Sequence, residues 1–237
     1  MTKLSSLSIF FPCFNEEQNI PFFVEEAFKL LPKIAKKYEV IIVDDGSVDK
    51  TYQVAKKFKK IHSEIQVVRH KKNRGYGASL KSGFEAAKFD WVFFTDGDLQ
   101  FNLGQIKKFL PYTSHGEVVI GYRKKRADGA FRTTNAQIYK MFVDVLFRLH
   151  VKDIDCAYKL FSKRALDLVT LESEGAFISA ELLYKLKKKK IRFKQLPVDH
   201  FPRRFGSPSG NNIGVILKAC KEAFRLYLHL KFGLFSV

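Results

Sequence analysis

The chain has 237 residues, of which 46% are hydrophobic, and its formal net charge is +18. It is long enough for one large domain with a full core, and its charge favours polyanionic partners such as nucleic acid, anionic lipids or phosphorylated substrates. Its three cysteines show neither a disulfide framework nor zinc-ligand spacing, which favours a reducing cytosol. We expect no signal peptide, because the first apolar stretch is short and interrupted, and no transmembrane helix, because no window of about 18 apolar residues exists.

The first half of the chain alternates short apolar runs with segments of helical length. We expect strands at 7–11, 40–43, 66–69 and 91–95, and helices at 21–38, 49–61 and 78–87. This alternation is typical of a doubly wound α/β sheet with right-handed crossovers. After about residue 121 the pattern predicts helices at 134–149, 176–189 and 213–235, a strand at 191–198 and a loop at 201–214.

Two aspartates at the end of the fourth expected strand are the most informative feature. Asp96 and Asp98 are one residue apart, and side chains at such positions of an extended segment point the same way. Neighbouring carboxylates repel each other, and a hard divalent cation that bridges to a diphosphate removes this penalty. The pair therefore predicts a metal clamp for a phosphorylated donor, with an ordinary polar turn as the alternative.

Polar segments also follow the other expected strands. Residues 12–17 follow the first strand, and Asp44 and Asp45 end the second. Because ligands of such sheets bind beyond the carboxyl ends of the strands, we expect these segments to converge. An aspartate there can accept a hydrogen bond from a nucleotide base, while Ser47 and Asp49 are suited to cap the next helix. A glycine turn at 75–77 predicts backbone amides that approach a nucleotide.

Four motifs occur in this order over about the first 125 residues: Phe11-Pro12-x-Phe14-Asn15-Glu16, Val43-Asp44-Asp45-Gly46-Ser47-x-Asp49, Asn73-x-Gly75-x-Gly77 and Asp96-x-Asp98-x-Gln100. Their order and spacing resemble the family 2 glycosyltransferases of GT-A fold, which implies a Rossmann-like, mixed and mainly parallel sheet flanked by helices. The resemblance implies a nucleotide-sugar donor, an inverting mechanism, and Mg²⁺ or Mn²⁺ held by Asp96 and Asp98. It also implies donor contacts, with Asp45 as the first candidate for the base, from Pro12, Phe14, Asn15, Glu16, Val43, Asp44, Asp45, Gly75, Gly77, Asp96 and Gly97.

The second half carries further motifs: Gly121-Tyr122-Arg123, then Arg132, the stretch 155–160, Glu181 and the stretch 200–208. These resemble the polyprenyl-phosphate sugar transferases, such as the dolichyl-phosphate mannose synthases. The resemblance implies catalytic roles for Asp98, Gln100 and Arg123, although Gln100 has the alternative of a simple hydrogen bond to a loop. Guanidinium groups match phosphate oxygens, and the implied contacts to the acceptor phosphate are Arg123, Arg132, Arg203, Arg204 and Ser207.

The expected reaction moves a sugar from GDP-mannose or UDP-glucose to a polyprenyl or dolichyl phosphate, with the enzyme peripheral on the cytoplasmic side of a membrane. We assign 1–210 to the catalytic domain, with 1–120 as its nucleotide-sugar half and 121–210 as its acceptor half, and 211–237 to an amphipathic helix. That helix carries a stripe of Lys218, Lys221, Arg225 and His229. It fits anionic lipids, a small membrane-anchoring partner protein, or packing on the core.

Two rival interpretations are a family 2 transferase acting on a polysaccharide or protein acceptor, and a basic nucleic-acid-binding protein. The arginines at 203 and 204 favour a phosphate acceptor over the first. The second is suggested by charge alone, because the aromatic-interleaved basic pattern of such proteins is missing from the sequence. We therefore expect no nucleic-acid partner.

Overall fold

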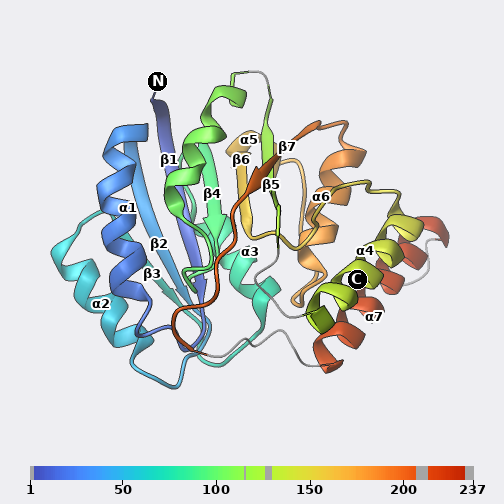
Figure 1. Ribbon diagram of the computed structural model, residues 1–237, viewed down its shortest axis with the longest axis horizontal. Coiled ribbons are helices and arrows are strands. Elements are labelled where there is room, and N and C mark those ends of the chain that lie inside the picture. The colour runs from blue at the N-terminus through green and yellow to red at the C-terminus, as the bar shows by residue number, and fades with distance from the viewer. Residues whose placement is uncertain (1–2, 115, 126–129, 207–212, 233–237) are drawn as a thin grey trace.

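The computed structural model describes residues 3–114, 116–125, 130–206 and 213–232. Within these ranges a seven-stranded sheet has the order β3-β2-β1-β4-β6-β5-β7 (Figure 1). The strands are β1 (Leu4–Cys13), β2 (Ala35–Asp44), β3 (Ile65–Arg69), β4 (Trp91–Thr95), β5 (Val118–Arg123), β6 (Tyr158–Ser162) and β7 (Phe193–Val198). β6 runs antiparallel to β4 and β5, and the pairs β1–β2, β1–β4, β2–β3 and β5–β7 are parallel. The predicted mixed, mainly parallel α/β sheet is confirmed.

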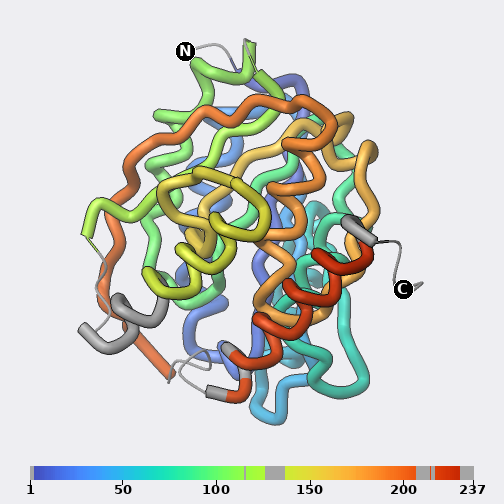
Figure 2. The backbone as a smooth tube through the Cα atoms, turned by 90° about the vertical axis from the view of Figure 1, so that its right-hand side faces the viewer, coloured from blue at the N-terminus to red at the C-terminus, as the bar shows by residue number. Residues whose placement is uncertain are grey.

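Helices cover both faces of this sheet (Figure 1). They are α1 (Ile20–Ile34), α2 (Thr51–Ile61), α3 (Tyr76–Ala86), α4 (Ala130–Phe147), α5 (Lys163–Leu166), α6 (Ile178–Lys188) and α7 (Ile213–Phe232), with the 3-10 turns η1 (Leu103–Lys108) and η2 (Leu110–Tyr112). α1 contacts η1 on one face, α3 contacts α6 on the other, and α4 lies beside α7 (Figure 2). In the described ranges, none of these helices combines the length and apolar character that crossing a membrane requires.

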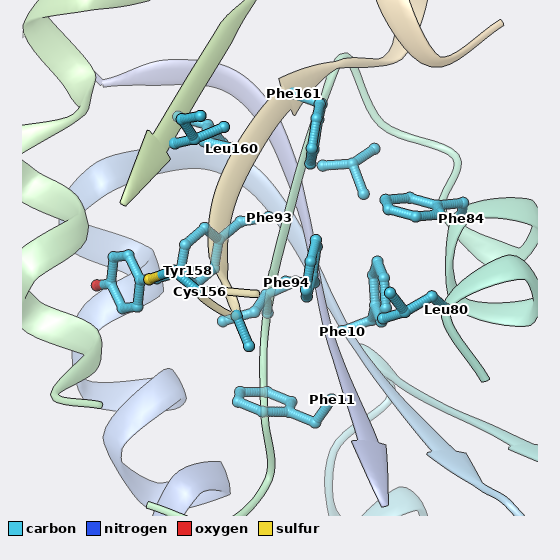
Figure 3. Packing of buried hydrophobic residues seen from close by; sticks show 14 of the residues in the cluster. Phe10, Phe11, Leu80, Phe84, Phe93, Phe94, Cys156, Tyr158, Leu160 and Phe161 are labelled. Carbon is cyan, nitrogen blue, oxygen red and sulfur yellow. The ribbon is translucent and has the colours of Figure 1, made fainter. Parts of the chain in front are cut away.

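Successive residues of β1 divide the core into two halves (Figure 3). Phe10 meets the edge of Phe84 in α3 with ring centroids 5.0 Å apart, whereas Phe11 stacks on Phe23 of α1 at 4.1 Å. Phe94 of β4 stacks on Phe10 at 5.4 Å and extends the aromatic layer on the α3 side. Neighbouring strand residues point to opposite faces, and each buried aromatic ring stabilises the fold by about 1.5–3 kcal/mol. The sheet is therefore packed between two helical layers, with aromatic contacts on both of its faces.

Two predicted boundaries were wrong. The first helix ends at Ile34 rather than near residue 38, and β2 begins directly at Ala35. The register gives the reason, because Ala35 pairs with Leu4 and the following residues complete the ladder of a long first strand. β1 also continues through Pro12, which pairs in register with Val43 and does not end the strand.

The strands β5 and β6 are not predicted by the sequence pattern. β6 is short and contains Lys159 within an otherwise mainly apolar run, which hides its strand character. It pairs with Phe94 of β4 on one side and Ile120 of β5 on the other, both through Lys159. Because β6 is antiparallel, its first residues lie at the edge where β1, β2, β4, β5 and β7 end. This edge gathers the segments that the sequence analysis singled out.

The packing of α3 on β1 depends on Gly83. A Cβ atom there would lie 2.3 Å from the Phe10 ring. Alanine is better than glycine in a helix by about 1 kcal/mol, but overpacking a core costs about 1–3 kcal/mol. We expect Gly83→Ala to lower the free energy of unfolding by about 1 kcal/mol net, measured by urea denaturation.

The matched control is Gly116→Ala, where the nearest atom would lie at an ordinary 3.7 Å. It should change the free energy of unfolding by less than about 0.5 kcal/mol. An equal or higher denaturation midpoint for the Gly83 variant would contradict this view of the α3–β1 contact.

Candidate active site

The thiol of Cys13, at the end of β1, marks the centre of the edge. Burial raises its pKa most, and the carboxylates of Glu16, Asp44, Asp96 and Asp98 raise the pKa further. These four groups come from the ends of β1, β2 and β4. The predicted convergence of these strand ends is therefore present in the structure.

Gly97 explains how the aspartate pair approaches β1. A Cβ atom on Gly97 would lie 2.9 Å from Cys13 Sγ and 3.4 Å from the Pro12 carbonyl oxygen. The absence of a side chain between Asp96 and Asp98 lets their loop pack directly on the end of β1. Leu99, the next residue, has a left-handed φ of 61°, so the chain turns sharply after the pair.

Asp96 and Asp98 form an electrostatically strained pair. Burial raises the pKa of Asp96 to about 7, and Asp98 raises that pKa as the next cause. Tyr76 donates a hydrogen bond to Asp96, but Oδ1 of Asp96 is buried and has no hydrogen-bond partner within the described part of the chain. Mg²⁺ and Mn²⁺ prefer such carboxylate oxygens, and Mg²⁺ is commonly held by one or two carboxylates plus substrate phosphates. The residues therefore fit a divalent cation.

Arg203 bridges two of the acidic loops. Its Nη2 lies 2.5 Å from Oε1 of Glu16 and 3.6 Å from Oδ2 of Asp98. Glu16 is 6% exposed, and burial raises its pKa to about 7 although Arg203 and Asn19 act in the opposite direction. Asn19, which directly precedes α1, donates its side-chain amide to Glu16 and does not cap the helix. A single guanidinium thus offsets charge from β1 and β4 together.

The loop that carries Arg203 is fastened to the aspartate loop. Phe201 N donates to the Gln100 carbonyl oxygen at 2.8 Å, and Gln100 Nε2 donates to the Phe201 carbonyl oxygen at 3.1 Å. The alternative of a loop hydrogen bond for Gln100 is therefore the one observed. Arg204 does not point the same way as Arg203, because its guanidinium lies 4.3 Å from the ring centroid of Phe22.

The end of β2 is tied to its neighbours by Asp44 and Asp45. Oδ1 of Asp44 accepts from Ser47 N at 3.0 Å, and its Oδ2 lies 3.4 Å from Nε of Arg69. The two oxygens of Asp45 accept from the backbone of Arg74 and Gly75 at 2.9 and 2.8 Å. Asp45 is thus the anchor of the glycine turn.

The loop after β1 is joined to the loop after β2. Asn15, at a left-handed φ of 58°, donates its backbone N–H to Ser47 Oγ, and its side-chain Oδ1 accepts from Val48 N. Ser47 therefore binds Asn15 and does not cap α2, which begins at Thr51. Phe14 in the same loop is 36% exposed, whereas Val43 is fully buried in β2.

The glycine turn has its amides occupied by protein. Gly77 N and Ala78 N both donate to the Glu174 carbonyl oxygen, at 2.9 and 3.3 Å. A Cβ atom on Gly77 would lie 2.5 Å from Glu174 C, and one on Gly75 would lie 2.9 Å from Glu174 O. These glycines admit the 172–175 segment, which buried Glu181 holds by accepting from Glu172 N and Ser173 N. The predicted approach of these amides to a nucleotide is not what they do here.

The remaining predicted arginines lie at different places. Arg123 ends β5 and forms a two-bond pair with Asp153, with Nε–Oδ2 at 2.7 Å and Nη2–Oδ1 at 2.8 Å. It still lowers the pKa of Asp96 through its charge. Arg132 belongs to α4, and its side chain lies outside the described residues, as does the whole of Ser207.

Lys159 and His70 were missed as site residues. Lys159 is 1% exposed and donates to the carbonyl oxygens of Ile154 and Cys156, and burial lowers its pKa. Its charge lowers the pKa of Asp96. His70, after β3, lies 2.6 Å from Asp45. The sequence held two signals of these residues: Lys159 interrupts an otherwise apolar strand, and His70 directly follows an apolar run.

The arrangement suits a ligand with neighbouring negative charges. A carboxylate pair that fits a divalent cation lies next to Arg203, and both are reached from the same strand edge. A cation on the pair and the guanidinium can together balance a diphosphate. The surrounding loops bind one another, so they offer a preformed frame for the rest of that ligand.

Comparison with known proteins agrees with this chemistry. Residues 8–169 match the family model described as glycosyl transferase family 2. The undecaprenyl-phosphate 4-deoxy-4-formamido-L-arabinose transferase of Aeromonas hydrophila is 27% identical over 207 residues, which cover 86% of this chain and 63% of that protein. The human dolichyl-phosphate beta-glucosyltransferase is 28% identical over 215 residues, covering 81% of this chain and 66% of that one.

A solved structure supports the fold assignment. Glucosyl-3-phosphoglycerate synthase from Mycobacterium tuberculosis, in complex with Mn²⁺, UDP and phosphoglyceric acid, superposes with a TM-score of 0.71. The identity is 19%, and the match covers 98% of this chain and 80% of that chain. The chain spans 53% to 66% of the length of six curated relatives that it matches.

The raised pKa of Glu16 has a measurable effect on stability. Its pKa rises from 4.5 to about 7 on folding. In this window the folded protein keeps a proton that the unfolded chain releases, so the free energy of unfolding falls as pH rises. At about 1.4 kcal/mol per pKa unit, Glu16 contributes at most about 3.5 kcal/mol to the fall. Glu16→Gln should therefore show a shallower fall, measured by urea denaturation between about pH 5 and pH 8.

The control is Glu25→Gln, which removes an exposed carboxylate whose partner is Lys29 one helical turn away. It should follow the wild-type profile. An equally steep fall in the Glu16 variant and the wild type would show that burial of Glu16 does not raise its pKa.

Proposed function

Because the chain belongs to glycosyl transferase family 2, we propose that it transfers a sugar from a nucleotide-sugar to a polyprenyl phosphate. The observation that carries the proposal is Arg203 placed between Glu16 and Asp98, beside the pair that fits a divalent cation. A site that combines a divalent cation with the guanidinium of Arg203 has the positive charge to bind two phosphorylated substrates. The printed names of two relatives, an undecaprenyl-phosphate and a dolichyl-phosphate transferase, support the same acceptor class.

The donor side is assigned to the ends of β1, β2 and β4. Asp96 and Asp98 would hold Mg²⁺ or Mn²⁺, and the solved relative bound to Mn²⁺ and UDP supports this choice. A cation bound there supplies charge neutralisation for a diphosphate. Asp45 keeps the role of base contact, with the 12–16 loop beside it. Whether the donor carries uridine or guanosine is tested below by comparing labelled UDP-glucose with labelled GDP-mannose.

The acceptor side is assigned to the arginine loop. Arg203 would balance the charge of the acceptor phosphate. Arg204, which stacks on Phe22, would be a second and more peripheral contact to that phosphate. Arg123 would act through its charge on Asp96 and not by contacting the phosphate, because its guanidinium is bound to Asp153. Arg132 and Ser207 stay predicted acceptor contacts.

The proposed chemistry needs little proton transfer. The acceptor phosphate is already ionised, so its oxygen needs no strong general base to attack the anomeric carbon. The bond between that carbon and the diphosphate oxygen breaks as the new bond forms on the opposite face. The products are the nucleoside diphosphate and an inverted polyprenyl-phosphate sugar. Gln100 contributes by keeping the arginine loop against the aspartate loop, which limits access of water.

Transfer of label tests this function directly. The chain is incubated with Mn²⁺, a polyprenyl phosphate and labelled UDP-glucose or GDP-mannose, and label is counted in a mild-acid-labile lipid fraction. Asp98→Asn should lower the rate by about 100-fold or more, because charge neutralisation at such sites is worth several kcal/mol. Asp167→Asn, which alters an exposed pair with Lys163, should leave the rate unchanged.

A near-normal rate for the Asp98 variant would contradict the metal assignment. Label found in polysaccharide or protein rather than in lipid would support the rival family 2 activity. Salt-sensitive DNA binding without any sugar transfer would support the nucleic-acid alternative.

We also propose that α4 and α7 rest on an anionic membrane. Ile138, Met141 and Val145 of α4 are 56%, 64% and 74% exposed, and their spacing places them on one face. On the adjacent α7, Leu217 and Phe224 are 65% and 52% exposed, and Lys218, Lys221 and Arg225 are exposed as well. Apolar side chains next to lysine and arginine are typical of interfacial helices. α7 also buries Ala219, Ala223 and Leu226, so it packs on the protein through another face.

Vesicle flotation tests this surface. Val145→Glu should reduce flotation with phosphatidylglycerol-containing vesicles by about threefold or more, because a charge replaces an apolar contact. The matched control is Ile61→Glu, because Ile61 is 71% exposed and its helix α2 lies at the opposite end of the sheet from α4 and α7 (Figure 1). Equal flotation of both variants would remove α4 from the interface, and failure of the wild type to float would favour a membrane-anchoring partner protein.

A further inference from the structure

His70 is held at both ring nitrogens in a buried chain of side chains. It follows β3, is 7% exposed, and its backbone N donates to the Asp44 carbonyl oxygen at 2.9 Å. Nδ1 lies 2.6 Å from Asp45 Oδ1, and Nε2 lies 2.9 Å from Ser82 Oγ in α3. A buried imidazole with two such partners has one fixed orientation.

The other hydrogen bonds of Asp45 show which group donates the proton in the hydrogen bond between His70 and Asp45. Oδ1 accepts from Arg74 N as well as facing His70, and Oδ2 accepts from Gly75 N. A carboxylate has about four acceptor positions. With backbone donors already aimed at it, Asp45 acts as the acceptor, so Nδ1 of His70 carries the proton between them. Three positions are then filled by the protein, and about one position is left for a further N–H donor.

The same contact fixes a loop. Gly46 has a left-handed φ of 68°, and a Cβ atom there would lie 2.3 Å from Lys72 C and 2.6 Å from Asn73 N. The 72–75 segment therefore lies directly on Asp45 and Gly46. His70 holds the start of this segment, and the Arg74–Glu174 ion pair of 2.7 Å holds its outer side.

We propose that His70 is a positioning residue that orients Asp45 toward the base of the donor nucleotide. The inference rests on the proposed function, in which Asp45 contacts the base. His70 itself is buried behind Asp45 and reaches no ligand. Its contribution is to keep Oδ1 occupied and the carboxylate plane fixed, so that the open acceptor position on Asp45 faces one direction. The specificity for a base N–H group then depends on a residue that the base never touches.

Two nearly isosteric substitutions separate this role from simple packing. In His70→Asn, the side-chain amide nitrogen takes the place of Nδ1 and keeps the bond to Asp45. In His70→Gln, the amide nitrogen takes the place of Nε2 and keeps the bond to Ser82 instead. Both remove the ring, so a role limited to filling space predicts equal effects. The proposal predicts unequal ones.

Calorimetric titration with UDP and GDP in the presence of Mn²⁺ measures the difference. For whichever nucleotide the wild type binds, His70→Gln should raise the dissociation constant about tenfold. His70→Asn should raise it by less than about threefold. In steady-state assays the same His70→Gln variant should raise the donor KM more than it lowers kcat. The control is Ser82→Ala, which removes the hydrogen-bond partner of His70 Nε2. It should change the dissociation constant by less than about twofold.

A second measurement uses the wild-type protein, so it does not depend on how the variants fold. The His70 Nδ1 proton, observed by NMR with ¹⁵N-labelled histidine, should shift when the nucleotide is added. Equal weakening by both His70 variants, an unaltered dissociation constant in His70→Gln, or an unshifted proton would overturn the proposal. Failure of wild type to bind either nucleotide would overturn the donor assignment itself, and this inference with it.

Discussion

Four carboxylates surround the buried thiol of Cys13, and removing them from water costs free energy that positive charge has to offset. The pKa values of Glu16 and Asp96, both raised to about 7, are the sign that the offset is incomplete. Arg203 pairs with two of the loops, while Lys159 and Arg123 act on Asp96 from the side of the sheet. Such a site is therefore poised to gain stability from an added cation. This constraint links the fold to its proposed chemistry, because the ends of β1, β2 and β4 bring these acids together.

The loops around the acids are ordered by contacts with one another. Asn15 binds the 47–48 turn, Asp45 binds Arg74 and Gly75, and Glu174 binds the start of α3. These contacts occupy the backbone amides that they involve, so in the proposed function side chains are the main source of recognition. A preformed frame of this kind lowers the entropy that is lost when a ligand binds.

The sequence predicted the sheet class and most of the edge residues, because apolar runs and strand-end acids are local signals. Asp96, Asp98, Asp44 and Glu16 lie together as their positions after strands required. It did not predict β5 and β6, whose pairing is set by partners far along the chain. Nor did it separate Arg203 from Arg204, or foresee the Asp153 partner of Arg123, since the direction of a side chain depends on tertiary contacts. The glycines at 75 and 77 were recognised as a turn, but the neighbour that requires them, Glu174, lies about a hundred residues away.

The position of β6 between β4 and β5 has a consequence for the order in which the molecule is built. During synthesis the first four strands can assemble as soon as they emerge, but β4 then presents an open edge until residues 158–162 arrive. β5 is made earlier and has no place to dock before that moment, because its neighbours β6 and β7 both follow it. An unpaired edge is prone to aggregation, so the newly made chain passes through a vulnerable interval. The open edge of β4 in the nascent sheet is therefore closed only when the antiparallel strand β6 pairs with it and, on its other side, with β5.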